Sequence, residues 1–178
     1  MALPKTDFKY TIYKTPSNGK IYYYNRIGSV LYLVQDSATS FRWNITSETR
    51  KIAGYSCQRA STTFAGRDYE AWFTREIPIS DGPYKFSGLP GLIMNVSDTR
   101  RDYIFELVKL TKPKFPTVIE MPEQAAKSTT MHQLYEGSKG YVLNLASRQA
   151  GKGLSIGEAR ILDAREQVRR RNNMIELK

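Results

Sequence analysis

Over its first 110 residues the chain alternates large apolar or aromatic side chains with polar ones, and this pattern restricts its fold most. Side chains of a β-strand point alternately to opposite faces, so a period of two predicts strands with one buried face. The intervals between the alternating segments are too short for crossover helices, so the strands should pair antiparallel. The segments are FKYTIYK, KIYYYNR, SVLYLVQ, FRWNI, YSCQRASTTF, YEAWFTR, LIMNVSD and RDYIFELVKL.

After Ser128 the apolar residues recur at intervals of three, four and seven up to Ala150, which predicts a helix. A second helix is predicted from Ser155, because Ser155 and Glu158 have the spacing of a capping box. Between sheet and helices, residues 112–127 include three prolines and should form an extended connector.

Together these patterns predict an α+β fold in a single domain over residues 1–178. An antiparallel sheet of about eight strands should occupy residues 8–111, and two helices within residues 128–178 should pack across it. The strands are short and glycines interrupt them, so we expect a strongly curved sheet, an open bowl or half-barrel. With 40% hydrophobic residues, the chain can bury one sizeable core.

The composition excludes several classes of site and location. One cysteine cannot form an intrachain disulfide, and one cysteine with one histidine cannot build an ordinary zinc site. We therefore expect neither a metal nor a cofactor. The N-terminal residues lack the apolar core of a signal peptide, and no stretch approaches the roughly 20 apolar residues of a membrane span.

The net charge of +10 raises the question of a nucleic-acid partner. Residues 1–54 carry half of the excess, with 8 Lys and Arg against 3 Asp and Glu. There the charges alternate with aromatic residues, as lysines do on the solvated face of a sheet. No nucleic-acid-binding module has a matching spacing in this chain, which argues against such a partner.

Asp68, Glu70 and Trp72 should point to the same side of one strand. Carboxylates two residues apart on a strand are separated by about 6.5–7 Å, which overlaps the pairs used in glycoside hydrolysis. Asp68 and Glu70 are thus candidate catalytic residues of a hydrolase acting on glycans or peptides. The structural alternative is a solvated face on which Arg67 or Arg75 balances the acids.

The stretch GPYKFSGLPGLI predicts a structural corner, with Leu89-Pro90-Gly91-Leu92 as a type II turn and a positive φ at Gly91. Its apolar side chains could instead line a groove. The candidate residues for binding a ligand or partner are Arg67, Trp72, Tyr84, Phe86 and Leu89.

Two other patterns have simpler explanations. Cys57 and His132 could form a nucleophile and base, but the strand pattern around Cys57 favours a buried structural thiol. GKGLSIG is similar to a dinucleotide fingerprint, yet it follows a helical pattern and is better explained by helix capping.

The run from FRWNI to GLPGLIMNVSD resembles the GLPGLI family, named after the hexapeptide at residues 88–93. The elements IAGYSCQRA, GRDYEAWFT, EIPI and GPYKFSGLPGLI follow in family order, and RRRNNMIEL resembles the family's C-terminal close. Met174 stands where the family pattern has proline. The resemblance extends from about Phe8 onward.

The resemblance implies an exported protein of the envelope of Bacteroidetes-type bacteria, periplasmic or associated with the outer membrane. It implies a trimmed or short form, because family members begin with a signal peptide. It supplies no activity, cofactor or catalytic residue. Together with the tyrosine- and tryptophan-rich composition, it favours a non-enzymatic module that binds an envelope protein, a glycan or a lipid-like ligand.

Overall fold

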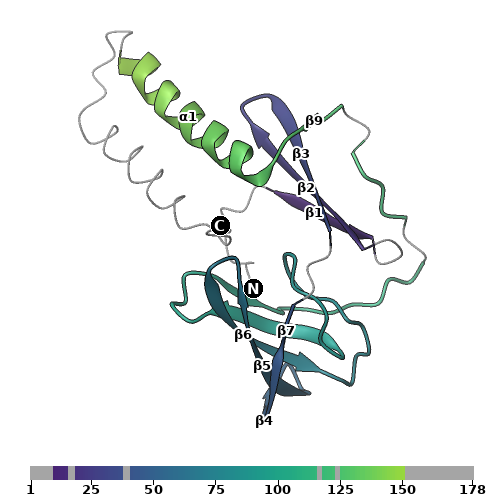
Figure 1. Ribbon diagram of the computed structural model, residues 1–178. Helices are drawn as coiled ribbons and strands as arrows, with labels where there is room; N and C mark the ends of the chain where they lie inside the picture. The colour runs from purple at the N-terminus through teal and green to yellow at the C-terminus, as the bar shows by residue number, and fades with distance from the viewer. Residues whose placement is uncertain (1–9, 16–18, 38–40, 116–117, 123–124, 151–178) are drawn as a thin grey trace. The chain divides into compact units, whose positions relative to one another are not determined.

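The computed structural model describes residues 10–15, 19–37, 41–115, 118–122 and 125–150 (Figure 1). These residues form two compact units. The described part of the first unit runs up to Ser37 and resumes at Glu120, and the second unit occupies the residues between. Each unit contains one β-sheet of its own.

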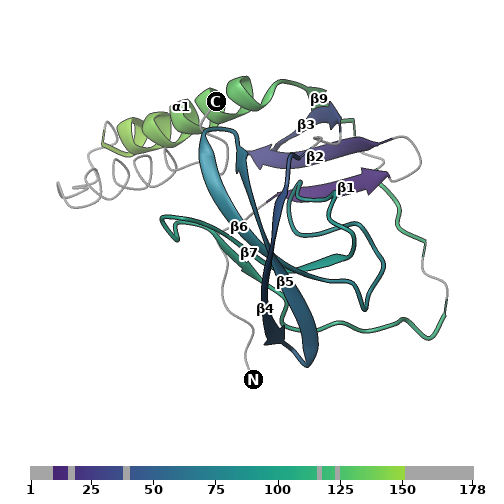
Figure 2. The ribbon, with the colours of Figure 1, turned by 60° about the horizontal axis from the view of Figure 1, so that its bottom comes forward.

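The sheet of the first unit has four strands in the order β1-β2-β3-β9 (Figure 2). The first three strands pair antiparallel, through hairpins that join neighbouring segments of the chain. The fourth comes from far along the sequence and pairs parallel to β3, with Tyr32 opposite Lys127. The strands are β1 (Thr11–Thr15), β2 (Lys20–Ile27), β3 (Val30–Ser37) and β9 (Lys127–Ser128).

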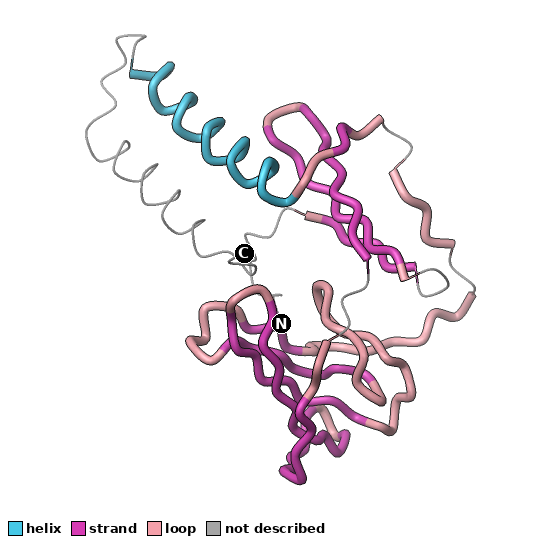
Figure 3. Tube along the Cα trace, in the orientation of Figure 1, coloured by secondary structure: helices cyan, strands magenta, loops and turns pink. Residues whose placement is uncertain are grey.

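The helix of the first unit is α1 (Met131–Ala150), which confirms the helix predicted between Ser128 and Ala150 (Figure 3). Its N-terminus has a capping box, in which the Gln133 N–H donates to Thr130 Oγ1 and the Thr130 N–H donates to Gln133 Oε1, both at 3.2 Å. Leu134 is buried. Further along the helix, Gly137 and Tyr141 approach the end of β2.

The second unit is an antiparallel sheet of five strands in chain order, β4-β5-β6-β7-β8. Two-residue Ala-Gly turns connect the first three strands, at Ala53-Gly54 and Ala65-Gly66, and all four residues have positive φ. Two positive φ values in a two-residue hairpin loop match the right-handed twist of paired strands. The strands are β4 (Asn44–Ile52), β5 (Tyr55–Phe64), β6 (Arg67–Thr74), β7 (Leu92–Asp98) and β8 (Ile104–Glu106).

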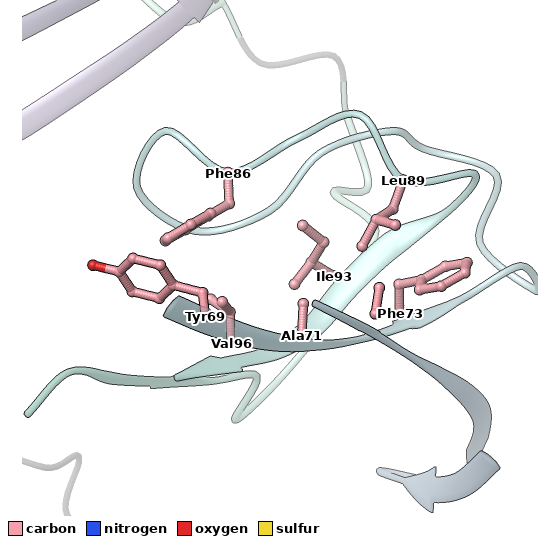
Figure 4. Packing of buried hydrophobic residues seen from close by; sticks show 8 residues of the cluster. Tyr69, Ala71, Phe73, Phe86, Leu89, Ile93 and Val96 are labelled. Carbon is pink, nitrogen blue, oxygen red and sulfur yellow. The ribbon is translucent and has the colours of Figure 1, made fainter. Parts of the chain in front are cut away.

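The core of this unit lies on one face of the five-stranded sheet, under the loop that connects β6 to β7 (Figure 4). The loop contributes Phe86 and Leu89, which are 0% and 1% exposed. Phe86 packs edge-to-face on Tyr69 with ring centroids 4.8 Å apart. Other buried members are Ala60, Ala71, Phe73, Ile93 and Val96. The loop is therefore part of the hydrophobic core.

Gly91 closes this loop and has φ 152°, which confirms the predicted positive φ. The predicted type II turn does not form. The Leu92 N–H donates to Ile77 O at 3.0 Å, and the Gly91 N–H donates to Leu89 O at 2.8 Å, so Pro90 is the centre of a three-residue γ-turn. A Cβ atom at Gly91 would fall 2.0 Å from Thr74 O, so glycine is also required for close backbone packing.

The prediction of one eight-stranded bowl followed by two helices is wrong, because the described strands form two separate sheets of four and five. The free edge of β3 is taken by β9, a parallel strand where the predicted connector meets the predicted helical part, so β4 starts a new sheet. Alternation in the sequence identifies strands but does not say which edges meet. The second helix, predicted from Ser155, lies outside the described residues.

Candidate functional site

The face of the five-stranded sheet opposite the core, here called the polar face, carries a connected row of charged side chains. Cross-strand pairing sets Arg59 of β5 opposite Trp72 of β6, and Trp72 opposite Asn95 of β7. Residues directly opposite one another in antiparallel strands share a face. Asp68 and Glu70 lie on this face as well, four and two residues before Trp72, respectively.

Glu70 is held between a guanidinium and an indole. Its Oε2 accepts hydrogen bonds from Arg59 Nε and forms an ion pair with Arg59 Nη2 at 2.7 Å. Its Oε1 accepts the Trp72 Nε1–H at 2.9 Å. Both carboxylate oxygens of Glu70 therefore already have donors inside the protein.

Arg59 continues this row to the edge strand, where its Nη1 donates to Glu48 Oε2 at 2.8 Å. The hydrogen bonds from Glu48 and Glu70 raise the pKa of Arg59 above its ordinary value. Thr49 of β4 lies opposite Gln58 of β5, so continuing this register by one residue places Glu48 opposite Arg59. The result is a continuous line of alternating charge across β4, β5 and β6.

Trp72 is covered from above by Arg50, whose guanidinium carbon lies 4.0 Å from the ring centroid. The ring is only 4% exposed. A guanidinium stacked on an indole face is a favourable cation–π arrangement. The outward surface at this point is therefore the plane of Arg50, with Asn95 Oδ1 at 3.5 Å from its Nη2.

Asp68 does not join this network. Its Oδ1 accepts a hydrogen bond from Thr63 Oγ1 at 2.6 Å, and the residue is exposed. Asp68 and Glu70 thus share a face but have separate partners. Neither Arg67 nor Arg75, the cations that the sequence suggested for these acids, forms an ion pair with them in the described residues; Arg59 pairs with Glu70.

Arg67 lies on the opposite face, where it is buried and contacts the buried carboxylate of Asp98 and the partly exposed carboxylate of Asp102. Its Nη1 is 3.0 Å from Asp98 Oδ2 and 2.9 Å from Asp102 Oδ2. Burial alone would lower the pKa of Arg67, but the hydrogen bond to Asp102 and the nearby charges raise it overall. The Tyr103 N–H also donates to Asp98 Oδ1. This cluster fixes the turn between β7 and β8.

Three of the remaining sequence candidates lie in or beside the core. Phe86 and Leu89 are buried there, and Tyr84 is half-buried with φ 53°. Cys57 is fully buried, and its burial raises the pKa of the thiol, which suits a structural residue better than a nucleophile. His132 is exposed on α1.

Sequence reasoning did not find Glu48, Arg50, Arg59 or Asn95. Their contacts depend on which strands pair and in which register, and no short motif encodes either. No group of three or more His, Cys, Asp or Glu side chains able to hold a metal occurs within the described part of the chain. None of the helical structure described there has the length and apolar character needed to cross a membrane.

Residues 65–95 match the profile of a family described as "Protein of unknown function (Porph_ging)". The matched segment runs from the turn before β6 into β7 and includes the loop with the GLPGLI hexapeptide. Membership of the GLPGLI family stays a prediction. None of the curated proteins compared matches the chain.

Among solved structures, the fold is similar to part of PNGF-II. The crystal form in space group C2 aligns with a TM-score of 0.59 at 17% identity, over 76% of this chain and 26% of PNGF-II. The form in space group P21 gives a TM-score of 0.55 at 16% identity, over 72% and 24%. This chain therefore spans about a quarter of the length of PNGF-II, and the likeness concerns the fold alone.

Proposed function

We propose that this chain is a non-enzymatic binding module of an exported cell-envelope protein, and that its polar face binds a glycan. The observation that carries the proposal is the row formed by Arg50 over Trp72, Glu70, Arg59 and Glu48. Planar side chains fixed by one another form a preorganised surface, which reduces the entropy lost on binding. The family resemblance supports the envelope location.

The exposure of the row supports contact with a polar ligand. The side chains of Glu48, Arg59 and Glu70 are 54%, 38% and 34% exposed, although their internal hydrogen bonds are satisfied. Glu48, the most exposed of the three, uses Oε2 for Arg59 and retains acceptor lone pairs on its other oxygen. Sugar hydroxyls can donate to these lone pairs while their ring faces lie against the Arg50 plane.

The contacts of the two acids support binding over hydrolysis. Glu70 is engaged on both oxygens by Trp72 and Arg59, and Asp68 is bonded to Thr63 on the same sheet. A general acid or base needs an oxygen directed at the substrate. The similarity to a quarter of PNGF-II further supports a module, because it shows this fold as part of a longer chain.

A glycan array followed by calorimetry with the strongest ligand tests the proposal. We expect Arg50→Ala to weaken binding at least about tenfold, because it removes the outer plane of the site. Lys51→Ala is the matched control, since it removes one positive charge from the next residue of β4 on the other face. Its affinity should equal that of the parent.

Equal affinities for Arg50→Ala and the parent would contradict the proposal, as would the absence of any glycan ligand. Hydrolysis on a panel of glycan and peptide substrates, lost in Asp68→Asn or Glu70→Gln, would replace it with an enzymatic function. Fractionation of the source cells tests the envelope location separately, because a cytoplasmic protein would contradict export alone.

A further inference from the structure

The segment that follows the last strand of the five-stranded sheet exposes large apolar side chains and lysines together. Hydrogen bonding to the sheet ends at Leu107, whose N–H donates to Met94 O at 2.8 Å. Residues 108–115, here called the basic strap, have no regular secondary structure and are all exposed. The strap is therefore attached to the sheet edge at one end and presented to solvent.

The apolar side chains of the strap are unusually accessible. Val108 is 63% exposed, Leu110 is 50% exposed and Phe115 is 78% exposed. Single exposed apolar residues are normal, but several within eight residues mark a surface that contacts another body. The apolar area alone does not identify the binding partner. The charges of the strap indicate the chemistry of that partner.

The strap carries Lys109, Lys112 and Lys114 and no acidic residue. Arg59 and Arg67 of the same unit are paired with carboxylates, whereas no ion pair involves the three strap lysines among the residues that the structure describes. Three uncompensated ammonium groups beside exposed apolar groups are complementary to an anionic, partly apolar surface.

We propose that the basic strap binds the surface of an anionic lipid bilayer. Lysine ammonium groups would contact lipid phosphates, while Leu110 and Phe115 enter the boundary between headgroups and acyl chains. This surface attachment requires no membrane-crossing element. It is independent of the glycan site on the polar face.

The order of residues in the strap favours lipid over a protein groove. In an extended chain alternate side chains face opposite ways, and both sets mix apolar and cationic groups, with Leu110 and Lys112 in one set and Lys109 and Phe115 in the other. A protein groove that binds a peptide as an additional β-strand recognises alternate side chains of the peptide and its backbone N–H groups. Pro113 lacks that N–H. A fluid layer of lipid headgroups can contact apolar and cationic side chains in any order along the chain.

Co-sedimentation of the whole chain with lipid vesicles tests this proposal. Vesicles of phosphatidylcholine with about 30 mol% phosphatidylglycerol should bind the protein at least about tenfold more strongly than pure phosphatidylcholine. About 0.5 M NaCl should abolish most of the binding, because it screens the lysine–phosphate attraction. Free glycerol phosphate should not compete, because it offers the headgroup without the apolar layer.

Two variants locate the binding in the strap. The triple substitution Lys109→Gln, Lys112→Gln and Lys114→Gln should reduce binding to anionic vesicles at least about tenfold. Its control removes three exposed cations elsewhere in the same unit, by Arg42→Gln, Lys51→Gln and Arg100→Gln. The control should retain most of the parent's binding.

The double substitution Leu110→Ser and Phe115→Ser should also weaken binding, whereas Ile79→Ser, which changes a 56% exposed apolar residue outside the strap, should not. Equal loss in the two triple variants would show a non-specific charge effect and overturn the proposal. So would equal binding to neutral and anionic vesicles, or no binding to either. Thermal melts of each variant confirm that the exposed substitutions leave the fold intact.

Discussion

The two sheets differ in where their covering elements come from in the sequence. The five-stranded sheet is covered by the loop between its own strands β6 and β7, so Phe86 meets Tyr69 over a short stretch of chain. The four-stranded sheet gains β9 and α1 only after the chain returns about a hundred residues later, with Tyr32 opposite Lys127. Closing a long loop costs more entropy than closing a short one.

Similar strand patterns thus form two sheets that differ in which parts of the chain they need to bury their cores. The second unit contains all the segments that bury its core, whereas the first requires two distant parts of the chain. Two probes separate the units: both tryptophans, Trp43 and Trp72, lie in the second, and the described helix lies in the first. Tryptophan fluorescence and circular dichroism at the helix band therefore report on different sheets.

The largest expected effect is that of Gly91→Val on the five-stranded sheet. A Cβ atom there would lie 2.0 Å from the Thr74 backbone oxygen, so β6 and β7 would have to separate. We expect a loss of about 4 kcal/mol or more in unfolding free energy, measured by tryptophan fluorescence during denaturation.

Gly54→Val is the control for this prediction, because Gly54 has φ 89° and no atom within 4 Å of the added Cβ position. It should show only the cost of a positive φ, about 1–2 kcal/mol. Equal losses in the two variants would mean that backbone packing at Gly91 is unimportant.

Substitutions in the hydrophobic cores of the two units should have smaller effects on the unfolding free energy, and these effects should differ between the cores. Phe86→Ala removes the centre of the aromatic cluster and should cost about 3–4 kcal/mol in the fluorescence transition. Val34→Ala, in the four-stranded sheet, removes less apolar surface and should cost about 1–2 kcal/mol in the helix transition. If each variant shifted both transitions equally, the two units would unfold together. That result would contradict the expectation that each core stabilises its own unit.

The smallest effect concerns pH and the five-stranded sheet alone. Burial raises the pKa of Tyr103, and the charge of Arg67, whose guanidinium carbon lies 5.3 Å from the ring centroid, opposes this only in part. A folded-state pKa above the unfolded value gives stability that is complete below about pH 10 and is lost as pH rises through the folded pKa.

We therefore expect the melting temperature, followed by tryptophan fluorescence, to fall more steeply above about pH 10 in the parent than in Tyr103→Phe. The phenylalanine variant keeps the ring but cannot ionise. Parallel pH profiles would show that the Tyr103 hydroxyl does not contribute to the pH dependence.

Sequence patterns alone located most strands and the helix, because those signals lie in neighbouring residues. Alternation in YEAWFTR marks β6, and apolar spacing after Ser128 marks α1. The requirement for glycine at position 91 was also readable, since Pro-Gly indicates a tight reversal. The same local rules place Asp68, Glu70 and Trp72 on one face.

Only the tertiary structure decided which strand edges pair, which side chains meet across them and what covers each sheet. The edge of β3 pairs with β9, which ends the first sheet before β4. The register of β4 with β5 brings Glu48 to Arg59, and the side chain of Phe86 packs from its loop into the core. An alternating segment has the same pattern beside any partner, so pairing depends on distant backbone groups that the segment itself does not encode.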